Sequence, residues 1–159
     1  MDLLIAQRDT IRLKWSEISD QHNVPPTLFD HQTDTVSLLL SRNNVLCALP
    51  TGSGKTLAQL TTVLFSEGTT AMVIPPLITI EKQMTDICDH WDISYINLSS
   101  VSNPKDIQLK IETAQPRIIF ASIEQISDLE VQRGLMNISL QYVALDEAQV
   151  WNSCSDTIE

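Results

Sequence analysis

The residues best suited to chemistry form one short loop, Thr51-Gly52-Ser53-Gly54-Lys55-Thr56, between an apolar run and a helical pattern. Its two glycines let backbone N–H groups converge on phosphate oxygens, where a Cβ atom would obstruct them. The next helix would present its own free N–H groups and positive dipole end to the same anion. Lys55 would place a charge on the terminal phosphates, and Thr56 would offer its hydroxyl to Mg²⁺. The strand–loop–helix context favours such a P-loop over a plain Gly/Ser turn, although Leu49 replaces the first glycine of the usual motif.

A second chemical feature is an acidic pair, Asp146 and Glu147, which directly follows the apolar run at 142–145. In a nucleotide site, Asp146 could hold Mg²⁺ through water. Glu147 could accept a proton from the attacking water or orient it. An acidic pair after a strand can also cap a helix, but its pairing with this P-loop favours the catalytic interpretation.

Composition limits the class of protein. The 159 residues are 43% apolar and 19% charged, which is typical of one globular domain. A net charge of −10 argues against broad electrostatic binding of nucleic acid, so any such contact has to be local. Three cysteines without a C-x-x-C pair fit a reducing intracellular compartment, and no apolar run approaches the roughly 20 residues of a membrane span.

The elements that must position these residues alternate along the chain. A helix is predicted at 3–18, and a second one begins after Asp30 as its N-cap. Further helices are predicted at 56–65, 77–90, 105–113 and 124–136. Strands are predicted at 45–49, 71–74, 94–98, 117–121 and 141–145. This alternation predicts a three-layer α/β domain with a mainly parallel sheet, preceded by an N-terminal helix. We expect a helical extension at 1–24 and the α/β domain at 25–159.

These motifs resemble a known family. Asp146-Glu147-Ala148-Gln149 is a DEAQ variant of the DEAD/DEAH box, and TGSGKT is its usual partner. The chain from 28 to 149 resembles the first RecA-like domain of superfamily-two helicases, and among them the RecQ type. Gln32 resembles the adenine-reading glutamine upstream of the P-loop. Residues 73–83 resemble motif Ia, which runs along the DNA backbone.

The resemblance implies ATP and Mg²⁺ as cofactors and DNA as a partner, contacted between Pro76 and Gln83. It implies catalytic roles for Lys55, Asp146 and Glu147, and Mg²⁺ binding by Thr56 and Asp146. The nucleotide would contact Gln32, Gln149 and the P-loop from Thr51 to Thr56. Two departures stand out: Phe29 replaces an arginine of the RecQ pattern, and Gln149 replaces a histidine that could titrate.

The length is short for this family, whose helicases use two RecA-like domains with ATP and an arginine finger at their junction. We therefore expect the ATP-binding half of a RecQ-like DNA helicase, moving 3′ to 5′ as the resemblance implies, and nuclear if eukaryotic and otherwise cytoplasmic. In such sheets the strand after the box lies between the P-loop strand and the box strand. We therefore expect unpaired edges at 45–49 and 141–145, and negligible hydrolysis by this chain alone. An RNA helicase, another superfamily-two translocase and a non-catalytic nucleotide-binding or interaction fragment remain alternatives.

Overall fold

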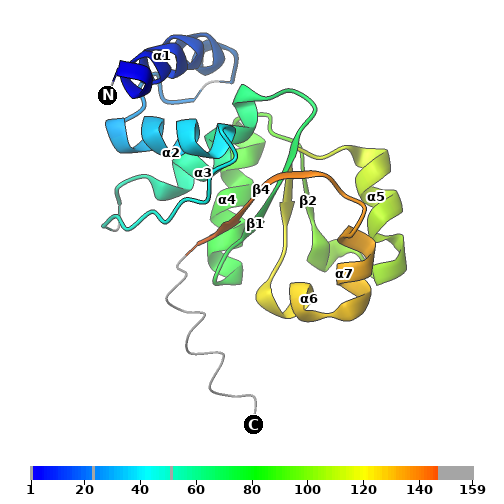
Figure 1. Ribbon diagram of the computed structural model, residues 1–159. Coiled ribbons are helices and arrows are strands. Elements are labelled where there is room, and N and C mark those ends of the chain that lie inside the picture. Colours follow the sequence, from blue (N-terminus) through cyan, green and yellow to red (C-terminus); the bar gives the residue numbers. More distant parts are fainter. Residues whose placement is uncertain (1, 23, 51, 147–159) are drawn as a thin grey trace.

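The computed structural model describes residues 2–22, 24–50 and 52–146 (Figure 1). Three α-helices and a 3₁₀ helix precede the first strand, and helices and strands alternate from there on. In chain order they are α1 (Asp2–His22), α2 (Asp30–Leu40), α3 (Lys55–Thr61), the 3₁₀ helix η1 (Thr62–Phe65), β1 (Thr70–Ile74), α4 (Ile78–His90), β2 (Tyr95–Asn97), the 3₁₀ helices η2 (Leu98–Ser100) and η3 (Pro104–Asp106), α5 (Ile107–Ala114), β3 (Ile118–Phe120), α6 (Ile123–Ser127), α7 (Leu129–Leu135) and β4 (Leu140–Leu145).

The four strands form one parallel sheet in the order β2-β3-β1-β4. β1 is interior: Val73 lies opposite Phe120 of β3 on one side and Ala144 of β4 on the other. Parallel neighbours need crossover connections, and the helices between the strands provide them. The predicted α/β class with a parallel sheet is confirmed.

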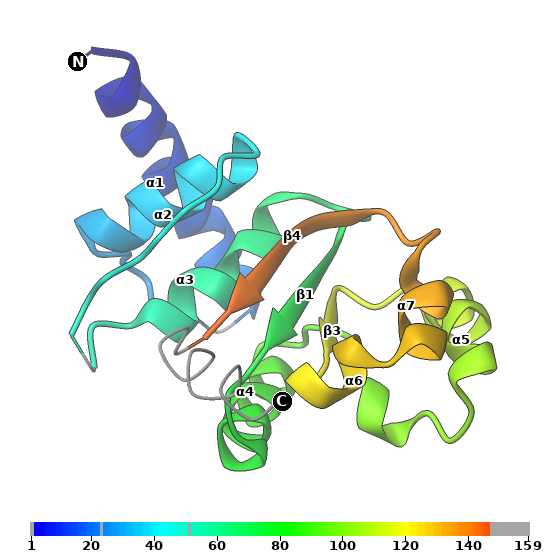
Figure 2. The same ribbon diagram turned by 60° about the horizontal axis from the view of Figure 1, so that its bottom comes forward.

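The sheet separates two hydrophobic clusters. Ala71 and Val73 point to the face covered by α1 to α4, whereas Met72 and Ile74 point to the face covered by α5 and α7. This alternation follows from the two-residue period of a strand, and all four side chains are buried because both faces are covered. Figure 2 shows the sheet between the two groups of helices, which makes the predicted three layers.

The predicted strand at 45–49 is wrong. This stretch forms no regular element, and no strand of the described residues pairs with it. Its exposure alternates, with Leu46 89% exposed and Cys47 and Leu49 half-buried. β4 is an edge strand with Val143 51% and Leu145 46% exposed, and a cavity of about 640 Å³ lies between it and residues 45–50. A strand exists only with a hydrogen-bonded neighbour, and this apolar run has none.

The N-cap of α2 also differs from the prediction. The cap is Phe29, not Asp30, because the Gln32 side-chain Oε1 accepts a hydrogen bond from the Phe29 N–H at 2.8 Å. Asp30 instead receives the Arg12 guanidinium of α1 at 2.5 Å. A glutamine at the third position of a helix can accept a hydrogen bond from the backbone N–H of the N-cap residue, even when that residue has no polar side chain.

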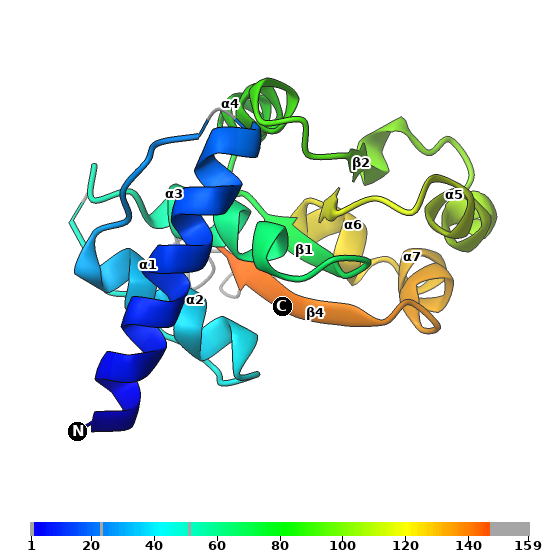
Figure 3. The same ribbon diagram turned by 90° about the horizontal axis from the view of Figure 1, so that it is seen from above.

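The N-terminal helix packs closely against the α/β layers. Trp15, 1% exposed, stacks on Phe65 of η1 with ring centroids 5.8 Å apart, and its Nε1 donates to the Pro25 carbonyl at 2.8 Å. Figure 3, from above, shows α1 lying over α2. The boundary at residue 24 remains a prediction. No helix of the described residues is long and apolar enough to cross a membrane.

Candidate nucleotide site

The backbone of the P-loop has the conformation that its glycines allow. Gly52 has φ +81° and Gly54 has φ +80°, and Gly54 is the N-cap of α3. A Cβ atom at position 54 would lie 2.3 Å from the Gln32 Nε2. Glycine is therefore favoured at position 54 by its left-handed backbone, and a Cβ atom there would also displace the Gln32 amide. Thr51 lies outside the described residues.

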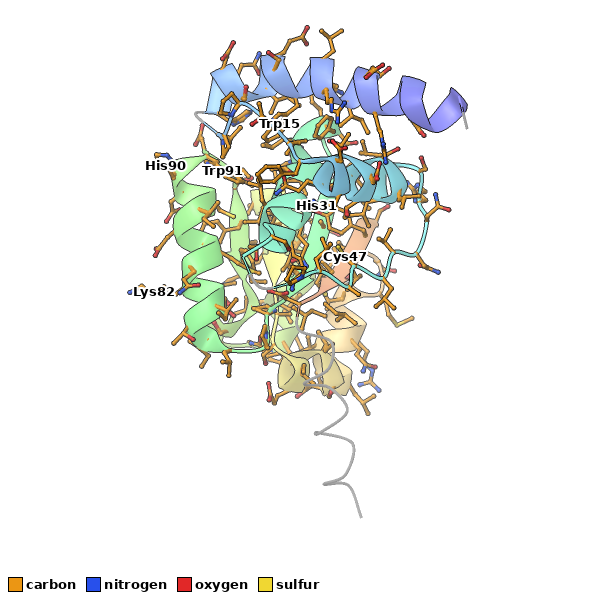
Figure 4. The ribbon with its side chains drawn as sticks, turned by 90° about the vertical axis from the view of Figure 1, so that its left-hand side faces the viewer. Trp15, His31, Cys47, Lys82, His90 and Trp91 are labelled. Carbon is orange, nitrogen blue, oxygen red and sulfur yellow. The ribbon has the colours of Figure 1, made fainter. Side chains whose placement is uncertain are left out.

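Two side chains of α2 hold the loop from one side. The His31 Nε2–H donates to the Ser53 carbonyl at 2.7 Å, and the Gln32 Nε2 donates to the Gly54 carbonyl at 3.2 Å. Figure 4 shows His31 on the side of α2 that faces away from α1. Gln32 is 1% exposed, and its amide also serves the Phe29 N–H, so its role toward adenine stays a prediction. Sequence reasoning missed His31; the only signal was its place beside Gln32.

Lys55 and Thr56 are the first two residues of α3, at the point where the loop ends. The Lys55 Nζ donates to the Leu49 carbonyl at 2.8 Å, so the lysine side chain bridges the two ends of the loop. Leu49 thus contributes a backbone oxygen despite lacking the glycine of the usual motif.

Asp146 reaches the same place from the sheet. It directly follows β4, is 7% exposed, and its backbone N–H donates to the Ile74 carbonyl at 3.2 Å. A cavity of about 360 Å³ joins the two motifs; it is lined by Gly52, Ser53, Gly54, Lys55, Thr56, Ile80, Gln83, Met84, Ile87 and Asp146. The structure therefore brings together the predicted phosphate loop and one predicted carboxylate. Glu147 and Gln149 lie outside the described residues.

The candidate DNA-contacting stretch begins at the end of β1 and enters α4. Leu77 is 63% and Ile78 83% exposed, while Gln83 lines the cavity beside the P-loop. Lys82 is the basic side chain between Pro76 and Gln83, and Figure 4 shows it at the outer surface of α4. Glu81 is turned inward to accept a hydrogen bond from the Asn97 amide. One end of α4 thus adjoins the candidate nucleotide cavity and also presents exposed side chains.

The donor set at this cavity fits a magnesium–nucleotide complex. Mg²⁺ prefers oxygen ligands, and the Thr56 hydroxyl and Asp146 carboxylate are of that type. A lysine and a glycine cradle beside them suit phosphate oxygens. Fold and site together have the features expected of a P-loop protein of the α/β class.

Sequence comparison gives the family. The pattern of the DEAD/DEAH box helicases matches residues 29–156, which include both the P-loop and the acidic box. The chain belongs to this family.

Three similar proteins are all named ATP-dependent DNA helicase RecQ. The protein of Bacillus subtilis is 30% identical over 111 residues, and that of Pasteurella multocida is 26% identical over 120. The protein of Synechocystis is 28% identical over 128 residues. These matches cover 68%, 74% and 76% of this chain but only 19%, 19% and 27% of the respective relatives.

Proposed function

We propose that this chain is the ATP-binding part of a RecQ-like, ATP-dependent DNA helicase. The observation that carries the proposal is that Lys55, Thr56 and Asp146 all line one cavity. These residues come from two motifs 90 positions apart and supply the cation and the oxygen ligands that a magnesium nucleotide needs. The names of the RecQ relatives support DNA rather than RNA as the polymer.

Each site residue has a proposed task. Lys55 leaves the Leu49 carbonyl and places its charge on the terminal phosphates. Thr56 and Asp146 would hold Mg²⁺, which would supply positive charge beside the phosphates. Glu147 orients or deprotonates the attacking water. Gln32 and Gln149 contact the nucleotide, and Thr51 completes the phosphate loop.

The proposed DNA contact is local. Exposed groups between Pro76 and Gln83, Lys82 among them, would meet the DNA backbone at the N-terminal end of α4. The acidic balance of the whole chain gives no broad attraction for phosphates, so this contact depends on few groups. Movement along DNA requires a second RecA-like domain, and 3′ to 5′ is the proposed direction. We propose a nuclear location if the source is eukaryotic and a cytoplasmic one otherwise.

A second candidate is a nucleotide-binding or interaction module without turnover. Two observations favour it: Lys55 and Gln32 both donate to backbone carbonyls at or next to the loop, and the net charge of the chain is −10. ATP hydrolysis by a polypeptide extended through the second domain separates the two candidates. We expect Glu147→Gln to abolish DNA-stimulated hydrolysis there; an unaltered rate in that variant would contradict the assigned role.

The nucleotide site is tested on the present chain by calorimetric titration with ATP and Mg²⁺. Lys55→Ala removes a charge-assisted contact of about 1.5–3 kcal/mol, so affinity falls about tenfold or more. Lys110→Ala is the matched control, because Lys110 is an exposed lysine on α5, across the sheet from α2 and α3. Equal binding by the wild type and Lys55→Ala would overturn the site.

A further inference from the structure

Helix α1 lies outside the stretch that matches the helicase family, yet two of its arginines contact the helix that holds the P-loop. The Arg8 Nε and Nη2 donate to the two carboxylate oxygens of Asp34 on α2, both at 2.5 Å. The Arg12 Nη2 donates to the Asp30 carboxylate at 2.5 Å. A bidentate guanidinium–carboxylate pair fixes an orientation as well as a distance.

The same turns of α2 carry the contacts to the loop. His31 and Gln32, which bond the Ser53 and Gly54 carbonyls, lie between Asp30 and Asp34 in sequence. One short helical segment is therefore held by α1 through its carboxylates and holds the P-loop through its neighbouring residues. In Figure 4, α1 lies on one side of α2 and His31 points to the other.

The ion pairs are better suited to orient α2 than to stabilise the fold. Their side chains are partly open to solvent, at 33% and 31% for Arg8 and Asp34 and at 44% and 74% for Arg12 and Asp30. Exposed pairs contribute little to stability. The hydrogen bond and charge of Asp34 nevertheless raise the pKa of Arg8, which agrees with a directional contact. The packing of Trp15 on Phe65 anchors α1 independently.

We propose that α1 positions the nucleotide site, with Arg8 and Arg12 as positioning residues. They fix the place of α2, and α2 fixes the Ser53 and Gly54 carbonyls and so the direction of the loop N–H groups. The ligand is the nucleoside triphosphate of the proposed function, on which this inference rests for its affinity readout. Loss of the pairs lets α2 shift relative to the loop and weakens binding, although neither arginine touches the nucleotide.

The first test compares affinities for ATP with Mg²⁺ by calorimetry, well below the melting temperature. We expect the Arg8→Gln/Arg12→Gln chain to bind about fivefold more weakly than the wild type. Arg133→Gln is the matched control, because it removes an exposed pair with Glu130 on α7, in the helical layer on the other side of the sheet. Exchanging the charges in Arg8→Asp/Asp34→Arg should restore most of the affinity lost in Arg8→Asp. Unchanged affinity in the double glutamine variant overturns the proposal.

The second test needs no nucleotide and separates positioning from a merely structural role. Amide hydrogen exchange is followed at Ser53 and Ala58, whose N–H groups donate to the Pro50 and Gly54 carbonyls, and at Ala71 in β1. We expect faster exchange at the Ser53 and Ala58 amides and unchanged exchange at Ala71 in the double glutamine variant. Equal acceleration at all three sites would mean that the ion pairs only stabilise the fold as a whole, and it would refute the proposal. If the wild type binds no ATP, the proposed function fails, and this exchange pattern still decides whether α1 positions the loop.

Discussion

Two apolar runs of similar length, Thr70–Ile74 and residues 45–49, have different structures although both read as buried strands. The first became β1, with β3 on one side, β4 on the other and both faces covered by helices. The second has no hydrogen-bonded neighbour and leaves Leu46 89% exposed. Apolar composition therefore makes a segment fit for a sheet, but pairing on its edges decides whether it becomes a strand.

The largest expected difference is in thiol reactivity, between a cysteine of the 45–49 segment and one in the cluster that buries one face of β1. Cys47 lies half-buried in the 45–49 segment, while Cys88 packs in the same cluster as Val73. Burial, and next the charge of Asp89, raise the pKa of the Cys88 thiol to about 12. In a Cys154→Ser background at pH 8, we expect Cys88 to react with a thiol reagent at least about a thousandfold more slowly than Cys47, because the thiolate is the reactive form. Comparable rates in the folded protein would contradict the burial of Cys88.

The same shift has a consequence for stability against pH. The pKa of Cys88 is higher in the folded state than its ordinary value of 9.0, so folding holds the proton more tightly. This contribution is fully present below about pH 9 and is lost as the pH rises toward 12. We expect the free energy of unfolding of Cys88→Ala to fall less steeply than that of the wild type above pH 9, measured by urea titration.

Next in size is the cost of truncating one side chain in each region. Ile74→Ala should lower the free energy of unfolding by about 2–5 kcal/mol, because Ile74 is 2% exposed and leaves a cavity. Leu46→Ala should change it by no more than about 0.5 kcal/mol. Urea midpoints at unchanged slope measure both. A similar loss in the two variants would show that the 45–49 segment is as well packed as β1.

The smallest expected effect concerns the open edge of β4. Val143→Lys places a charge on an edge residue that is 51% exposed, which should raise solubility severalfold with little change in stability. Leu109→Lys is the control, since Leu109 is 64% exposed but lies on α5. Light scattering against concentration gives the readout. An equal gain in solubility in both variants would show that the molecules associate through exposed apolar side chains in general and not through the edge of β4.

Local patterns were enough to predict most of the fold. β1, β3, β4 and α4 follow from apolar runs and helical periodicity, and the structure places them within a few residues of the prediction. The P-loop and Asp146 were found because their chemistry needs fixed residue types at fixed spacing. Both come together at one cavity.

What could not be predicted depends on tertiary neighbours. Nothing in 45–49 itself reveals that its edge lacks a partner. The Phe29 cap depends on which way the Gln32 amide turns, and Asp30 was unavailable because Arg12 approaches it from another helix. The His31 bond to Ser53 joins residues 22 positions apart, a distance at which sequence spacing carries no signal.

The order of strands in the sheet has a consequence for how the chain folds as it is made. Trp15, Phe65 and the Arg8–Asp34 pair all lie within the first 65 residues, so the helical layer can form early. β1 can pair only after much more of the chain has been made, because Ala71 pairs with Ile118 and Thr70 pairs with Leu140. Until those segments leave the ribosome, both edges of β1 are open, and only the helices made before them can shield its faces. Such long-range parallel pairing is slow and exposed to aggregation, so we expect α1 and α2 to protect the nascent β1.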